Sequence, residues 1–341
     1  MTPHAATPDC MNQPRDTGSA PRKPHSRISL VRCPDYDLAR VRQALRELLE
    51  PLGGMKAFVS AGARVVLKPN YVVARPADRC ANTHPVVILA VAELVRECGG
   101  EPIVADSPGW GSAENVAEVS GFAPLARQAG IPIVSLKDPV RPSTHHTVRF
   151  LRTSATIQQA DVVINLPKFK AHQQMLLSLA VKNVFGCVPG RRKAGLHMLS
   201  RDDRHWFARM LIENYQAVQP HLTIMDAIVA MEGNGPSNGT PRPLGFFMAG
   251  TDCVAMDRVA VEILGIPWRE LTTLAAAAEM GVGCTRLDEI GIVGPPPHEL
   301  RPAEFHLPLL MPISFSPWRI ARGLIRNYII LWKEQKARKR A

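Results

Sequence analysis

Closely spaced cysteines are absent from this sequence of 341 residues, although it contains seven cysteines. They stand singly at positions 10, 33, 80, 98, 187, 253 and 284, without a CxxC pair. Iron–sulfur clusters and structural zinc sites use such spacings, so no intrinsic iron–sulfur motif is present and the sequence names no other cofactor. Isolated thiols suit a reducing compartment, and we expect a cytoplasmic protein.

Long apolar runs are also missing. No stretch reaches about 18 consecutive apolar residues, so the sequence predicts no membrane-spanning helix. Residues 1–26 are rich in Pro, Thr, Ser and charge and lack the apolar core of a signal peptide, which predicts a disordered arm. We expect residues 27–300 to form an α/β domain, as one unit or two lobes, and residues 301–341 to form a linker and a C-terminal helix.

Excess positive charge is scarce in the body of the chain. The formal net charge is +11, but residues 316–341 carry +7 and residues 1–27 carry +2, which leaves +2 for the rest. Basic and aromatic residues are not interleaved in that central part. The sequence therefore argues against nucleic acid as a partner.

The most informative feature that the sequence does have is a set of five apolar runs that stop at polar side chains. They are RVVLKPN, PIVADSPG, DVVINLPKFKAH, LTIMDAI and FFMAGTD, and helical patterns separate most of them. Such runs are typical of a mostly parallel sheet with helices on both faces. Because ligands bind beyond the carboxyl ends of parallel strands, we expect the five polar endings to meet at one edge.

The segments between these runs give further expectations. Helices are predicted over residues 36–52, over 112–128, over QMLLSLAVKNVFG and after Thr83, which is expected to cap its helix. A strand is predicted at TVRFL. The LTIMDAI and FFMAGTD runs are expected to belong to a second unit like the β-α-β unit formed by RVVLKPN and PIVADSPG.

The densest charged cluster lies at the end of the third run. Lys168, Lys170 and His172 alternate along an extended segment, so we expect all three on one face. Two ammonium groups and an imidazole would bind an anion and exchange a proton near neutral pH. The alternative is a charged face in solvent.

Two other strand ends add Lys68 with Asn70 and Asp106 with Ser107. A lysine at a strand end can hold a carboxylate or phosphate. Asp106 can orient a lysine, hold a metal or cap the next helix. The loop ADSPGWG that follows fits neither the Walker A pattern nor the dinucleotide-binding pattern.

Basic residues follow in KNVFGCVPGRRKAGLH. Lys182 and Asn183 lie in an apolar pattern that indicates burial, and a buried lysine must be paired or lose its charge. Arg191, Arg192, Lys193 and His197 are expected on a mobile lid that closes over anionic groups, the alternative being an ordinary basic surface.

Two aspartates complete the candidates. Asp226 is expected in the site because aspartate is rarely buried without a partner, whereas Asp252 is expected to be a helix N-cap. A divalent cation held by both of them and Asp106 is an alternative that lacks a diagnostic spacing, so metal content stays open.

Taken together, these motifs resemble a known family. VVLKPN, THP, ADSPG, ADVVINLPKFKAH, KNVFGCVPGRRKAGLH, MDAIVAMEGNGP and GTDCVAMD match, in order, the domain of unknown function 362 family over about residues 60 to 265. The reaction of that family is not generally established. Many of its members carry a bacterial-type ferredoxin module, so the resemblance implies redox work; without that cysteine run, this chain would need a separate ferredoxin partner.

A basic amphipathic pattern covers residues 318–333. At about 100° per residue, the aliphatic and aromatic side chains fall on one half of a helix and the Arg and Lys side chains on the other. This pattern predicts that residues 317–341 bind an anionic membrane surface, at the inner face of the membrane. Docking of the helix on protein is the alternative.

The sequence therefore predicts an enzyme of isomerase, lyase or transferase type that acts on an anionic small organic substrate by acid–base chemistry. The residues expected in catalysis are His172, Lys168, Asp106, Asp226 and His197, and those expected in substrate binding are Lys68, Asn70, Ser107, Lys170, Lys182, Asn183, Arg191 and Arg192. The alternatives are an iron–sulfur-linked redox accessory protein that works with a separate ferredoxin, and a non-catalytic membrane-surface protein.

Overall fold

The computed structural model describes residues 26–144 and 146–314, and the predicted C-terminal helix lies outside this part of the chain. A mixed sheet of ten strands forms its centre, with the main order β12-β1-β11-β10-β7-β2-β3-β4 and with β8 and β9 attached beside β10. The strands are β1 (Ser26–Arg32), β2 (Arg64–Pro69), β3 (Glu101–Asp106), β4 (Ile133–Ser135), β7 (Val162–Leu166), β8 (Lys168–His172), β9 (Leu176–Ser178), β10 (Leu222–Glu232), β11 (Thr240–Gly250) and β12 (Ile290–Val293), while β5 (Pro139–Val140) and β6 (Thr153–Ser154) pair separately.

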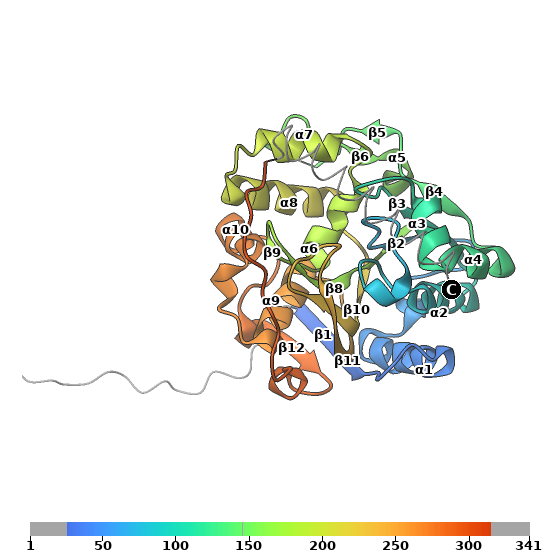
Figure 1. The fold of residues 1–341 in the computed structure, drawn as a ribbon. Helices are drawn as coiled ribbons and strands as arrows, with labels where there is room; N and C mark the ends of the chain where they lie inside the picture. Colours follow the sequence, from blue (N-terminus) through green and yellow to red (C-terminus); the bar gives the residue numbers. More distant parts are fainter. Residues whose placement is uncertain (1–25, 145, 315–341) are drawn as a thin grey trace, which may run out of the picture.

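Helices cover both faces of this sheet (Figure 1). They are α1 (Leu38–Leu49), α2 (Pro85–Glu97), α3 (Ala113–Ser120), α4 (Phe122–Ala129), α5 (Ala155–Gln158), α6 (Ala180–Asn183), α7 (Arg192–Leu199), α8 (Arg204–Val218), α9 (Cys253–Leu264) and α10 (Thr272–Met280). Helices α1 to α4 pack into one apolar core and α6 to α10 into the other. This arrangement confirms the predicted α/β fold with a mostly parallel sheet.

The central strands run in the same direction. β7, β2, β3 and β4 are successive parallel neighbours, and β10 is parallel to β7 and β8. Their apolar runs are buried because both faces of the sheet are covered. Their carboxyl ends therefore share one edge, which places the polar endings of four of the five predicted runs together.

The fifth run was placed wrongly. β11 is antiparallel to both β10 and β1, so it ends at the opposite edge of the sheet. The connection between β10 and β11 spans only residues 233–239, whereas a parallel crossover needs about a dozen residues or more. Asp252 lies beyond that opposite end, where it caps α9 as expected by accepting from the N–H groups of Val254 and Ala255.

Several local predictions also need correction. The apolar run QMLLSLAVKNVFG forms strand β9, the single-turn helix α6 and a 3-10 turn (Val184–Cys187) instead of one helix, because a short apolar run does not distinguish strand from helix. TVRFL forms no strand. Residues 112–128 form two helices, since Gly121 adopts a left-handed conformation between them (φ 88°).

The helix after Thr83 has a different cap from the one predicted. The side chain of His84 accepts from Val86 N and forms the N-cap of α2. Thr83 bonds away from the helix, because its hydroxyl donates to Leu166 O and accepts from Asn70 N. Thr83 thus ties the end of β7 to the end of β2.

The last described segment returns across the body toward α7, as the dark red trace of Figure 1 shows. Met311 N donates to Gln173 O, and the Gln174 side chain donates to the carbonyls of Pro312 and Ile313. No helix in residues 26–144 and 146–314 is long and apolar enough to cross a bilayer.

Candidate functional site

The first element of the site is a buried ion pair between neighbouring strand ends. Lys68 at the end of β2 and Asp106 at the end of β3 are both 1% exposed, and Lys68 Nζ lies 3.0 Å from Asp106 Oδ2. Asp106 also accepts from the backbone N–H groups of Tyr71 and Ser107 at 2.8 and 2.7 Å. Because the carboxylate is fully engaged, Lys68 is held in place and its charge is balanced.

A second buried pair lies across the sheet, between β8 and β10. Lys168 Nζ lies 2.8 Å from Asp226 Oδ2 and donates to the Tyr36 hydroxyl at 2.7 Å. The Tyr36 hydroxyl in turn donates to Asp226 Oδ1, and the Tyr36 ring stacks on His84 with centroids 3.6 Å apart. Burial raises the pKa of Tyr36 well above its ordinary value, and the charge of Asp226 adds to this effect, so Tyr36 stays a neutral hydrogen-bond donor.

Amide side chains connect the strand ends beneath these pairs. Lys170 Nζ donates to Asn70 Oδ1 and to Ala81 O, and Asn70 donates to Asn183 Oδ1 at 2.7 Å. Asn183 continues to Asn165 Oδ1 at 2.8 Å. These buried donors and acceptors satisfy one another, as polar groups removed from water must. They join β2, β7, β8 and α6 into one framework.

Lys168, Lys170 and His172 do not share one ligand space, although they alternate along β8 as predicted. Lys168 is paired with Asp226, whereas Lys170 bonds the Asn70 side chain and a carbonyl. The irregular register between β8 and β10 separates their surroundings. The alternation was read correctly, but the pattern cannot show which partners fill the space in front of each side chain.

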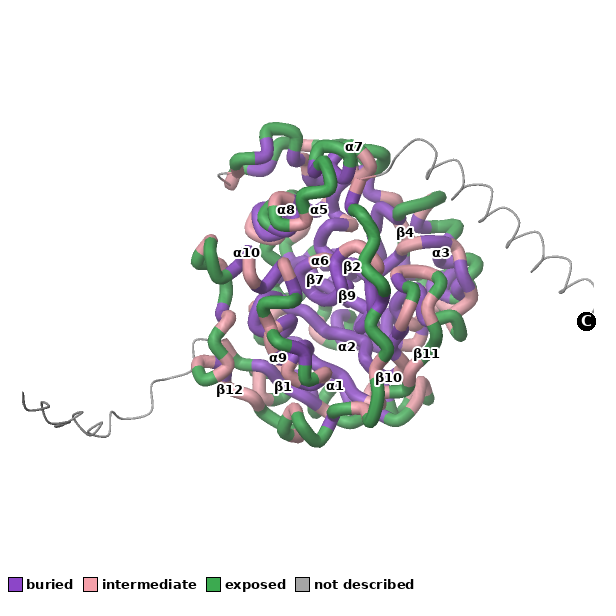
Figure 2. The backbone as a smooth tube through the Cα atoms, turned by 60° about the vertical axis from the view of Figure 1, so that its left-hand side comes forward, coloured by how far each residue is buried: buried purple, intermediate pink, exposed green. Residues whose placement is uncertain are grey.

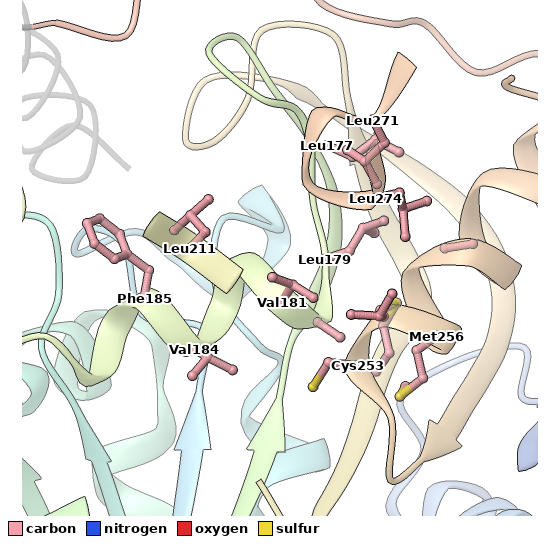
Figure 3. Close-up of a cluster of buried hydrophobic side chains, with 14 of the residues drawn as sticks. Leu177, Leu179, Val181, Val184, Phe185, Leu211, Cys253, Met256, Leu271 and Leu274 are labelled. Carbon is pink, nitrogen blue, oxygen red and sulfur yellow. The ribbon is translucent and has the colours of Figure 1, made fainter. Parts of the chain in front are cut away.

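Helix α6 holds Lys182 close to these strand ends. Val181 beside it lies among apolar side chains that include Leu211 of α8, Cys253 of α9 and Leu274 of α10, as Figure 3 shows. The N–H groups of Ala180 and Val181 donate to Asp257, whose pKa is raised to about 8 by burial. The short helix is thus fixed by apolar packing on one side and by a buried carboxyl group at its start.

Lys182 differs from the other lysines of the site. Within the described residues its ammonium group has no hydrogen bond and no ion pair, and it lies over the Phe185 ring, 5.6 Å from the ring centroid. Burial, and then the charge of Lys193, lower the pKa of Lys182 to about 8. An ammonium group in this state is a strong ligand for an anion and a titratable group near neutral pH.

Two imidazoles lie within electrostatic range of Lys182. Burial lowers the pKa of His172 well below its usual range, and the charges of Lys182 and Lys170 lower it further. The same causes, burial and then Lys182, bring the pKa of His197 to about 3. Both imidazoles are therefore neutral at pH 7.

Hydrogen bonds fix the orientation of both rings. Gln174 N donates to His172 Nδ1, so the ring proton of neutral His172 is on Nε2. The Nδ1 atom of His197 contacts Ile313 O at 3.2 Å, which ties α7 to the returning segment.

Lys193, at the start of α7, closes the site from the other side. Its ammonium donates to Ser107 O, to the Ser107 hydroxyl and to Val188 O, at 2.6, 2.7 and 3.1 Å. Burial lowers its pKa to about 8. The predicted mobile loop is thus ordered in part as α7, while Arg191 and Arg192 are exposed at its beginning and are not brought into the hydrogen-bonded site.

The metal alternative is not supported by the geometry. Asp252 lies at the opposite edge of the sheet, and the other two aspartates are each paired with a lysine. Among residues 26–144 and 146–314, no group of three or more His, Cys, Asp or Glu side chains could hold a metal ion.

Sequence reasoning missed three residues of this site, namely Tyr36, His84 and Gly186, and it placed Lys193 on the lid without choosing it as a site residue. Tyr36 comes from the segment before α1, which no local pattern connects to a strand end about 190 residues away. Gly186 lies directly over the first ion pair, where a Cβ atom would be 2.3 Å from Asp106 Oδ1 and 2.5 Å from Lys68 Nζ. Lys193 was visible in the basic loop, and its neighbours Arg191 and Arg192 were chosen instead.

Comparison with known proteins gives a family and one similar protein of known name. The model of the domain of unknown function 362 (DUF362) matches residues 65–262. A thylakoid-associated protein, sll1697, of Synechocystis sp. is 42% identical over 305 residues, which cover 89% of this chain and 94% of that protein.

A comparison of folds adds a distant structure. The lactate racemase apoprotein of Thermoanaerobacterium thermosaccharolyticum aligns with a TM-score of 0.48 at 10% identity, over 73% of this chain. This chain covers 60% of the length of that structure.

Proposed function

This chain belongs to the DUF362 family, and we propose that it is an enzyme that acts on an anionic small organic substrate at the carboxyl edge of its sheet. The observation that carries the proposal is the state of Lys182, a lysine held among packed side chains without a hydrogen-bond or ion-pair partner in the described part of the chain. An ammonium group that is only partly accessible to water and has no counter-charge is costly unless a ligand supplies that charge. The expected ligand therefore carries a carboxylate or phosphate.

The charge balance around Lys182 supports an anionic ligand. Burial and then the charge of Lys182 lower the pKa values of Lys170, His172 and His197, while burial and the charge of Lys193 lower that of Lys182. The nearby carboxylate of Asp106 is already engaged by Lys68. An anion would relieve this repulsion, so bound ligand and folded protein should stabilise each other.

In this proposal the basic residues have different tasks. Lys182, with a pKa of about 8, can hold an anionic group and take up or release a proton near neutral pH. Neutral His172 presents its Nε2–H, which can donate a hydrogen bond to a substrate oxygen without adding charge. Such a pair suits isomerase, lyase or transferase chemistry, in which charge develops on an oxygen and a proton moves.

The two ion-paired lysines have a supporting part in this proposal. Asp106 and Asp226 hold Lys68 and Lys168 with distances of 3.0 and 2.8 Å, and both lysines are almost fully buried. They orient the strand ends and contribute to the local electrostatic potential, while Lys182 and its neighbours contact the substrate directly. This division modifies the sequence-based expectation that Lys68 and Lys168 bind the anion themselves.

An anion-dependent stability measurement tests the proposal. We expect phosphate or citrate, at constant ionic strength, to raise the melting temperature of the full chain, and Lys182→Met to abolish most of that increase. Lys56→Met is the matched control, because Lys56 is exposed and lies in the turn Met55–Ala57 before the start of β2, whereas the site lies at the end of that strand. An unchanged increase in Lys182→Met would overturn the assignment of this site.

Membrane association is a separate proposal that concerns residues 317–341. The amphipathic pattern of that segment and its excess of Lys and Arg support binding to an anionic membrane surface. The 42% identical relative is called thylakoid-associated, which is in keeping with attachment to a membrane.

A further inference from the structure

An exposed apolar segment lies near the end of the described chain, in the part that returns toward α7. Leu309, Leu310 and Met311 are consecutive, and they are 85%, 48% and 43% exposed. Leu307 close by is 40% exposed. Folded proteins rarely leave several large apolar side chains together in water without an interaction that covers them.

Helix α7 extends this apolar surface. Met198 and Leu199, at its end, are 54% and 48% exposed. Hydrogen bonds join the segment to two helices, because His197 of α7 contacts Ile313 O and Arg204, at the start of α8, donates to Met311 O. We define the docking face as Met198, Leu199, Leu307, Leu309, Leu310 and Met311. Figure 2 shows the exposed backbone at α7, and Figure 1 shows the end of the described chain reaching it.

Basic residues border the docking face. Residues 191–206 contain five Lys or Arg and two Asp, which gives this stretch a charge of +3. Arg191, Arg192 and Arg201 are exposed. The described chain ends at Ser314, which donates to Asp202, and the residues from 316 onward carry a further +7. Such a surface suits an anionic bilayer, because the apolar side chains can enter the lipid interface while the cationic side chains bind the headgroups.

We propose that this docking face inserts its apolar side chains into the interface of an anionic lipid bilayer. Two other occupants fit the charges less well. A second copy of the chain would bring a second basic border against the first, and residues 316–341 of the same chain would add their own excess of positive charge to it. A bilayer with negative headgroups complements both the border and the adjoining segment. The inference is independent of the proposed reaction.

Vesicle binding by the full chain tests this assignment. We expect sedimentation with vesicles of phosphatidylcholine and phosphatidylglycerol, and much weaker sedimentation with phosphatidylcholine alone or at high salt. The triple variant Leu309→Ser, Leu310→Ser, Met311→Ser should reduce the partition coefficient at least about tenfold, because it removes apolar surface from the lipid interface. Val119→Ser with Val293→Ser is the matched control, since both valines are exposed at other elements.

Each other occupant has its own result. Unchanged vesicle binding by the triple variant would overturn the proposal and leave attachment to the segment 317–341 alone. A lowered melting temperature of the triple variant without vesicles would show that the chain covers the docking face itself. A dimer of the original chain that the triple variant converts to a monomer would show a second copy there. The proposal requires lost binding with an unchanged melting temperature and an unchanged mass in solution.

Discussion

Lys68 and Lys182 lie in the same site but have opposite surroundings. Lys68 is sealed from water and bonded to Asp106, whereas Lys182 is partly accessible and lacks such a partner within the described residues. Burial of a lysine is therefore not by itself a sign of function. What distinguishes a ligand-binding lysine from a structural one here is whether the protein already supplies its counter-charge.

The largest change in stability should follow from breaking the buried Lys68–Asp106 ion pair. Lys68→Met leaves the Asp106 carboxylate buried with only backbone donors, and we expect the free energy of unfolding to fall by about 3–5 kcal/mol. Urea denaturation at pH 7 measures this. The double variant Lys68→Met, Asp106→Leu should recover most of the loss, and a single variant as stable as the original chain would remove the contrast with Lys182.

Replacing Lys182 should raise the free energy of unfolding, which is opposite to the effect expected for Lys68. The pKa of Lys182 is about 8 in the folded protein against an ordinary value of 10.5, so the folded state binds fewer protons than the unfolded state between these values. Its charge costs stability at pH 7, and this cost disappears as the pH rises from 8 to 10.5. Lys182→Met should raise the free energy of unfolding at pH 7 by up to about 2 kcal/mol after allowance for solvent, and should lose that pH dependence.

Urea denaturation from pH 7 to pH 10.5, without added anions, measures this effect. Lys56→Met should leave the profile unchanged because Lys56 is exposed. A Lys182→Met protein that is less stable at pH 7 would indicate that the ammonium group has a partner after all.

A smaller loss should follow from a change at Gly186, which lies against the Lys68–Asp106 ion pair. Gly186→Ala places a Cβ atom against Asp106 Oδ1 and Lys68 Nζ, and the required shift should cost about 1–3 kcal/mol. Gly195→Ala on α7 is the control, since a Cβ atom there meets open space and alanine favours a helix. Thermal unfolding of both variants measures this loss. If Gly186→Ala were as stable as the original chain, the Lys68–Asp106 pair would be able to move aside.

The smallest effect is expected at the surface. Arg46 and Glu97 form a two-fold hydrogen-bonded pair at 2.7 and 2.8 Å between α1 and α2, but both side chains are about half exposed. Glu97→Ala should change the free energy of unfolding by less than about 1 kcal/mol, because water and salt screen the charges. A loss of stability comparable to that of Lys68→Met would show that burial does not determine how much an ion pair contributes to stability here.

Much of the fold could be predicted from the apolar runs. Continuous buried strands and their polar endings are visible in the sequence, and they placed Lys68, Asp106 and Asp226 near one edge of the sheet. The apolar run FFMAG does not indicate the direction of β11, because it is equally apolar when it is read in either direction. The connection between β10 and β11 is too short for a parallel crossover and therefore indicates an antiparallel strand, but this signal was not used.

The site was predicted less completely than the fold. Strand ends identify which polar side chains come near one another, but they do not show which of them are already paired. The Tyr36 hydroxyl that joins Lys168 to Asp226 is contributed from about 130 residues before Lys168, and no spacing rule connects the two. The partners, and hence the difference between Lys68 and Lys182, depend on tertiary contacts.

The bare backbone of Gly186 also limits how the molecule can move. Its carbonyl accepts from Ser107 N, and its missing side chain lets the turn after α6 press directly on two charged groups. Helix α6, which carries Lys182, is therefore anchored to the sheet through this turn, and it cannot move outward without exposing Lys68 and Asp106. Any movement that admits a ligand would then involve α7 and the returning segment, which are held through the Lys193 ammonium group and the carbonyl groups of Ser107 and Ile313.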